Sequence, residues 1–78
     1  MVKYAVFEHN VIIDGKKQIT YGIKAEEIFG GKVHTVCEVY DVTPNRERAE
    51  YLCRECNEND LSPVHLRDVC EDFLYAES

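Results

Sequence analysis

Two thiols separated by two residues have the clearest chemical potential in this chain. Cys53-Arg54-Glu55-Cys56 has the spacing of motifs that bind zinc or cycle between a dithiol and a disulfide. Redox-active thiols owe their low pKa to a helix N-terminus, whereas this pair falls toward the C-terminal end of a predicted helix, beside acidic residues. The position of the motif therefore argues against redox activity.

A zinc site would need further ligands from other parts of the chain. The candidates for this alternative function, a zinc- or thiol-dependent protein, are Cys37, Cys53, Cys56 and Cys70, with His34 or His65. These ligands come from three separate predicted elements and do not form two adjacent ligand pairs. Three of the cysteines also occupy apolar stripes, where small buried thiols are common. We therefore expect thiols that fill the core, no cofactor, and no structural disulfide in a reducing cytosol.

Two other groups of residues have the composition of acid–base sites. His65, Asp68 and Asp72 fall on one flank of a predicted helix, where a carboxylate can polarise a histidine. Glu8 and Glu38 fall on two strands that flank a central strand, as a pair of catalytic carboxylates would. Neither group has a nucleophile or a cleft predicted beside it, so we expect no catalytic residue and no enzyme.

The elements that would position these residues begin with three strands, over about residues 2–13, 17–28 and 33–42. Asp14-Gly15 suits the positive φ angles of a tight hairpin turn. With these two as the central turn residues, Val6 lies opposite Ile23 and Phe7 lies opposite Gly22, where the ring can cover bare backbone. A loop two residues longer would shift these pairs but keep the faces.

The second turn, at Gly30-Gly31, leaves two registers open for the third strand. The preferred register has a two-residue turn and adds three residues to the face of Ile19, Tyr21 and Ile23. These three residues are Val36, Tyr40 and Val42. A change of one residue brings in Cys37 and Val39 instead.

Two helices are predicted over about residues 44–57 and 63–75. Thr43-Pro44 and Ser62-Pro63 each provide a capping side chain followed by a proline suited to the first helical position. Glu50 and Arg54 are spaced as an i,i+4 ion pair. The last helix has one apolar stripe, formed by Leu66, Val69, Cys70, Phe73 and Leu74. We predict one α+β domain over residues 1–78: a three-stranded antiparallel meander with two antiparallel helices packed on one sheet face.

Charge is distributed unevenly over the 78 residues, whose net charge is −6. Residues 1–39 are balanced, whereas residues 40–78 hold four arginines and ten acidic residues. The acidic helical half would repel a phosphate backbone, so we expect no nucleic-acid partner. The chain has no long apolar run, so we expect no membrane span, no signal peptide and a cytoplasmic location.

The sheet face opposite the helices is the candidate interaction surface. Ala5, Phe7, Gly22 and Val39 are expected to cluster there, and a two-layer domain has nothing left to cover them. The other interpretation is a few tolerated apolar side chains. We expect a small non-enzymatic interaction or regulatory module whose partner is another protein or a second copy of the chain.

Several motifs spread along the chain resemble one known family. They are Asp14-Gly15, Tyr21-Gly22-Ile23, Asp41-Val42-Thr43, Leu61-Ser62-Pro63-Val64-His65-Leu66, Asp68-Val69 and Glu71-Asp72-Phe73-Leu74. The combination resembles short proteins of clostridia and related Firmicutes that are classed as a domain of unknown function. The resemblance implies a bacterial cytosolic protein and gives no catalytic residue to carry over. It also implies that Cys53, Cys56 and Cys70 stand where similar chains usually have aliphatic residues.

Overall fold

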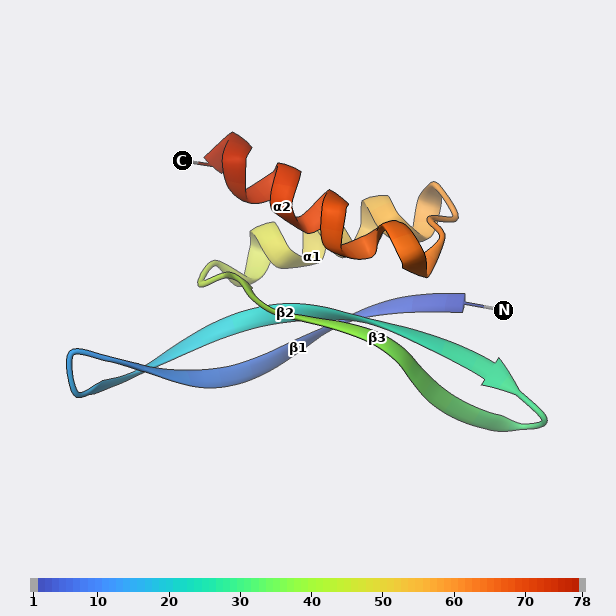
Figure 1. Ribbon diagram of the computed structural model, residues 1–78, viewed down its shortest axis with the longest axis horizontal. Coiled ribbons are helices and arrows are strands. Elements are labelled where there is room, and N and C mark those ends of the chain that lie inside the picture. The colour runs from blue at the N-terminus through green and yellow to red at the C-terminus, as the bar shows by residue number, and fades with distance from the viewer. Residues whose placement is uncertain (1, 78) are drawn as a thin grey trace.

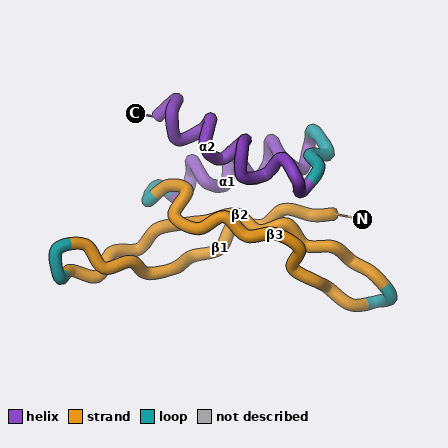
Figure 2. Tube along the Cα trace, viewed as in Figure 1, coloured by secondary structure: helices purple, strands orange, loops and turns teal. Residues whose placement is uncertain are grey.

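The computed structural model describes residues 2–77 as two layers, a sheet and a pair of helices (Figure 1). The elements are β1 (Val2–Ile13), β2 (Lys16–Phe29), β3 (Lys32–Thr43), α1 (Arg46–Glu58), a 3₁₀ turn (Pro63–His65) and α2 (Leu66–Glu77). The strands form an antiparallel sheet in the order β1-β2-β3. Both helices cover one face of it, α1 next to β1 and α2 next to β3 (Figure 2). The predicted α+β architecture is confirmed.

The first hairpin has the predicted register. Asp14 and Gly15 have φ angles of 52° and 76°, the left-handed conformations that a two-residue hairpin turn requires. Val6 pairs with Ile23, and Phe7 pairs with Gly22. The two turn residues therefore determine on which side of the sheet each of the twelve residues of β1 places its side chain.

The second hairpin begins with the expected two-residue turn, because Phe29 pairs with Lys32. The register then changes: Glu26 pairs with Thr35, but Ala25 pairs with Cys37. The extra residue in β3, Val36, is a bulge, and a bulge of one residue exchanges the two faces of the strand beyond it.

The preferred register of the third strand is therefore wrong for two of its three residues. Val36 and Tyr40 are 47% and 59% exposed, while Cys37 and Val39 pack against the core. A second irregularity follows at Asp41, whose φ angle is 53°, and it returns Val42 to the core. Between Val39 and Thr43, β3 advances four residues while β2 advances two, so this segment holds two extra residues.

The starts of the helices differ from the predicted caps. Thr43 still belongs to β3, and its hydroxyl accepts a hydrogen bond from the backbone N–H of Asn45 at 3.2 Å. Asn45 is the N-cap of α1, and its side chain accepts from the N–H of Arg48 at 3.1 Å. Ser62 precedes the 3₁₀ turn without a side-chain cap, and its carbonyl accepts from the N–H of His65 at 2.9 Å. The proline after Ser62 thus starts one tight turn before α2 begins at Leu66.

The core lies between the sheet and the two helices. Each of its residues has less than one tenth of its surface exposed to solvent. They are Tyr4, Ile23, Ala25, Val42, Leu52, Cys53, Cys56, Leu66 and Cys70. In residues 2–77 neither helix is long and apolar enough to cross a membrane.

Candidate functional site

Three of the four cysteines are core residues. Cys53, Cys56 and Cys70 are buried free thiols, and Cys37 is partly exposed. Burial is the main cause that raises the pKa of Cys70 to about 12 and that of Cys56 to about 11. Burial, followed by the charge of Glu50, also raises the pKa of Cys53. These thiols are protonated near neutral pH, the form in which a thiol is not nucleophilic.

The metal candidates do not converge. Over residues 2–77 no three His, Cys, Asp or Glu side chains are placed to hold a metal ion. His34 and His65 are both exposed, on β3 and at the end of the 3₁₀ turn. The arrangement gives no support to the zinc- or thiol-dependent alternative.

The two acid–base candidates are also separated. His65, Asp68 and Asp72 are exposed, and within the described chain no hydrogen bond or ion pair joins them. Glu8 pairs with Tyr21 on the helix side of the sheet, whereas Glu38 pairs with Lys24 on the outward side. The bulge in β3 therefore puts the two carboxylates on opposite faces, contrary to the expectation of a shared face.

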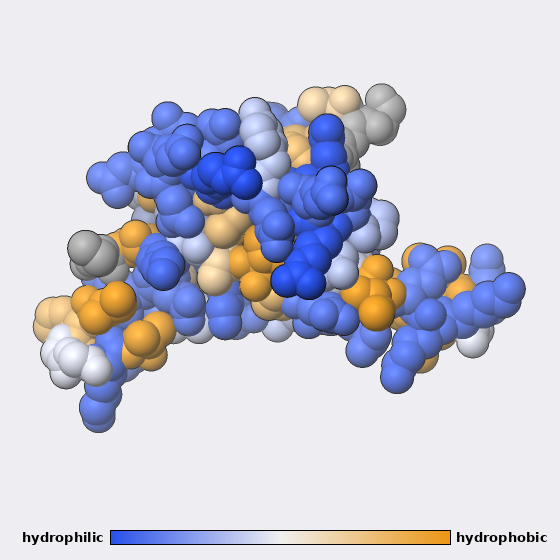
Figure 3. Space-filling model, turned by 180° about the vertical axis from the view of Figure 1, so that it is seen from behind, coloured by the Kyte–Doolittle hydropathy of each residue, from blue (hydrophilic) through white to orange (hydrophobic). Residues whose placement is uncertain are grey.

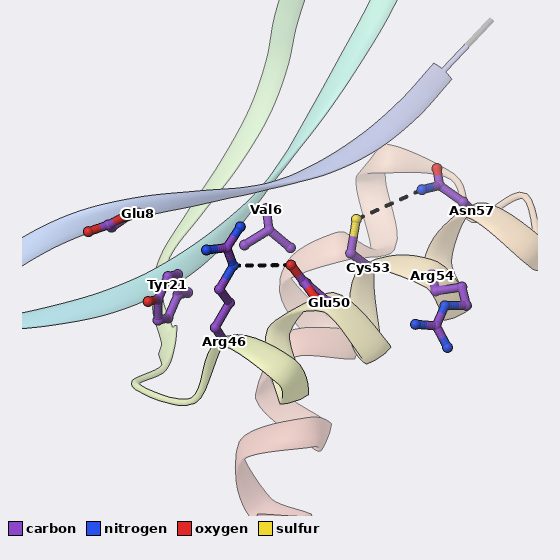
Figure 4. A pocket seen from close by; sticks show the side chains of 8 residues that line it. All are labelled: Val6, Glu8, Tyr21, Arg46, Glu50, Cys53, Arg54 and Asn57. Carbon is purple, nitrogen blue, oxygen red and sulfur yellow. Dashed lines mark hydrogen bonds and ion pairs between the residues drawn. The ribbon is translucent and has the colours of Figure 1, made fainter.

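A groove runs between β1 and α1, with a volume of about 570 Å³ (Figure 4). Its lining comes mostly from these two elements: Val6, Glu8, Tyr21, Arg46, Glu50, Cys53, Arg54 and Asn57. The Arg46 guanidinium bonds Glu50 at 3.1 Å, so the predicted pairing of Glu50 with Arg54 is wrong. Both acidic and basic groups are present, and the size is in the range of ligand sites.

Three rings meet on the outward face of the sheet. Phe7 and Tyr40 have centroids 5.0 Å apart in an edge-on arrangement, and His9 lies 5.6 Å from Phe7 and 5.1 Å from Tyr40. Ring pairs of this kind stabilise the folded state beyond what the burial of their apolar surface contributes. We call Phe7, His9 and Tyr40 the ring cluster.

Hydrogen bonds attach the ring cluster to β3 at Glu38 and Asp41. His9 Nε2 accepts from the backbone N–H of Asp41 at 2.8 Å, and the Tyr40 hydroxyl donates to Glu38 at 2.7 Å. The buried Thr20 hydroxyl lies 2.7 Å from the Asp41 carboxylate and 3.2 Å from the Thr43 carbonyl. These bonds hold Asp41 in its left-handed conformation and present the Tyr40 ring beside Phe7.

The predicted interaction surface is present in part. Ala5 and Phe7 lie on the outward face by register, and the Phe7 ring covers Gly22 so closely that a Cβ there would lie 2.5 Å from Phe7 Cζ. Val39 does not belong to this surface, because the bulge turns its side chain toward the core. Tyr40 takes its place.

Two members of the ring cluster were missed by sequence reasoning. His9 follows Phe7 by two residues, and this period of two on a strand was a usable signal. Tyr40 carried no such signal, because its face depends on the bulge at Val36, which the sequence did not indicate.

One comparison identifies the family of the chain. The model of the Family of unknown function (DUF6514) matches residues 1–76, so the chain belongs to this family. No curated protein and no solved structure matches the chain significantly.

Proposed function

We propose that this member of a family of unknown function is a small non-enzymatic interaction module of the bacterial cytosol, with the outward sheet face as its contact surface. The observation that supports the proposal best is the ring cluster. Tyr40 is 59% exposed and Phe7 is partly exposed, and both helices lie on the other face (Figure 1). Aromatic anchors of this kind carry much of the energy of protein interfaces.

The ends of the sheet extend the apolar surface. Figure 3 shows hydrophobic residues at both ends of the sheet, beyond the part that the helices cover, and mostly hydrophilic residues over the helices. Ile13 and Ile28, which lie on the outward face by register near the two hairpin turns, are 49% and 46% exposed. Exposed apolar residues that gather along one layer favour contact with a partner.

The raised pKa values of the thiols agree with a role outside catalysis. Free cysteines in all four positions suit a reducing cytosol. The partner is a protein with an apolar patch, or a second copy of the chain.

The test compares two exposed tyrosines. Tyr40→Ser should weaken recovery of a partner from an extract of the source organism about tenfold or more, as for an aromatic hot spot. Tyr51, which is 52% exposed on α1, provides the matched control Tyr51→Ser. Equal recovery by the two folded variants would remove the outward face as the contact surface.

The homodimer is tested separately. Light scattering at several protein concentrations should show a dimer that Tyr40→Ser dissociates and Tyr51→Ser does not. A monomer at every concentration would leave a different protein as the partner.

A further inference from the structure

On the outer edge of β1, the Asn57 side chain bonds the backbone of Tyr4 as a neighbouring strand would. The Tyr4 backbone N–H donates to Asn57 Oδ1 at 2.8 Å, and Asn57 Nδ2 donates to the Tyr4 carbonyl at 3.1 Å. Two such bonds to one residue are what an adjacent antiparallel strand supplies. The Asn57 carboxamide therefore occupies, at Tyr4, the place of a fourth strand.

The same edge continues without such a partner. Backbone groups of a strand point alternately to its two sides, so Val6 and Glu8 direct their N–H and C=O groups to the same edge as Tyr4. The register of β1 is regular through these residues. Within residues 2–77 no backbone or side-chain hydrogen bond covers the edge at Val6 or Glu8. Exposed edges of this kind are templates for strand addition.

The groove lies where an added strand would run. Val6 and Glu8 line it on the side of β1, and α1 forms the opposite wall (Figure 4). Asn57, the residue that imitates a strand, also lines it. A peptide in the groove would continue the pattern of bonds from Asn57 along β1 and would pack side chains against α1.

The charges of the groove indicate the chemistry of the peptide. Arg46 is paired with Glu50, whereas Glu8 and Arg54 make no side-chain hydrogen bond or ion pair among the described residues. Arg54 belongs to the lining of the groove. A carboxylate on the peptide would give this guanidinium a partner.

We propose that the groove between β1 and α1 is a second binding site, which receives an extended peptide of a partner protein as a fourth strand, with a carboxylate of the peptide facing Arg54. This site is separate from the ring cluster and uses other residues. A second copy of the chain fits less well, because β1 of that copy would bring its own α1 against the same groove.

The test selects ligands and then locates them. A library of random twelve-residue peptides is selected on the immobilised chain, and the enriched peptides are synthesised. They should be extended and share an acidic residue, and in NMR spectra they should slow amide exchange at Val6 and Glu8. Tyr4, already bonded to Asn57, should be protected without peptide, and Asn57→Ala should remove that protection.

Two changes test the assigned contacts. Arg54→Gln should weaken binding about two- to fivefold, as expected for an exposed ion pair, while Arg67→Gln on α2 serves as the control. In an added strand every second N–H of the peptide faces β1. N-methylation of these nitrogens should abolish binding, whereas N-methylation of the nitrogens between them should leave binding unchanged.

Three results would overturn the proposal. One is the absence of enriched peptides, and another is binding that shifts the amides around Phe7 instead of Val6 and Glu8. The third is a free chain that dimerises with these edge amides already protected.

Discussion

The two faces of the sheet differ in how they are held, although the same strands form both. On the covered face Ile23 is fully buried within the hydrophobic core cluster. On the outward face Phe7 lies over Gly22 and beside Tyr40, and a hydrogen bond from the Asp41 N–H to His9 supports the group. The covered face supplies stability by burial, whereas the outward face holds exposed rings in a defined position.

Truncation on the covered face should have the largest effect. Ile23→Ala is expected to lower the free energy of unfolding by about 2–5 kcal/mol, because the cavity that it leaves is enclosed by two layers. Ile28→Ala, in the same strand but 46% exposed on the outward side, is the matched control. We expect it to stay within about 0.5 kcal/mol of the parent. Urea denaturation measures both, and equal losses would remove the distinction between the faces.

A methyl group under the Phe7 ring should have an intermediate effect. Gly22→Ala would place Cβ 2.5 Å from Phe7 Cζ and against the Val39 carbonyl, so the ring or the strand must move. Overpacking of this kind costs about 1–3 kcal/mol. NMR shifts of the Tyr40 ring should change as Phe7 leaves it. An unchanged thermal midpoint together with unchanged ring shifts would contradict the close packing.

Alkaline pH should lower the folding stability through the buried thiols of the covered face. Near pH 9 this effect should be smaller than those of the two substitutions. Burial raises the pKa of Cys70 from an ordinary 9.0 to about 12 and that of Cys56 to about 11. The unfolded chain therefore releases thiol protons before the folded chain does, and stability is full below about pH 9 and falls as the pH rises toward these values.

Urea denaturation from about pH 8 upward checks this direction. Cys70→Ala should lower stability at neutral pH through lost packing but reduce the dependence on alkaline pH. If the free energy of unfolding of the parent stayed constant up to about pH 10, the thiols would have the same pKa values in the folded and unfolded chain.

Much of the fold followed from local chemistry. Asp14-Gly15 predicted the first hairpin and its register, and the apolar stripes around Leu52 and Leu66 predicted helices with one buried side. The burial of Cys53, Cys56 and Cys70 followed from their place on those stripes. In each case the deciding residues are neighbours in the chain, so the signal is present in a short window.

The sequence by itself thus determined the order of the elements, the first register and the buried thiols. Only the tertiary structure decided the irregularity of β3 at Asp41, because the Asp41 N–H donates to His9 and its carboxylate accepts from Thr20, both far away in the chain. The groove has the same origin, since Asn57 reaches Tyr4 only after α1 has packed beside β1. Contacts between distant residues depend on the summed packing of several elements, and no local pattern of residue types encodes that sum.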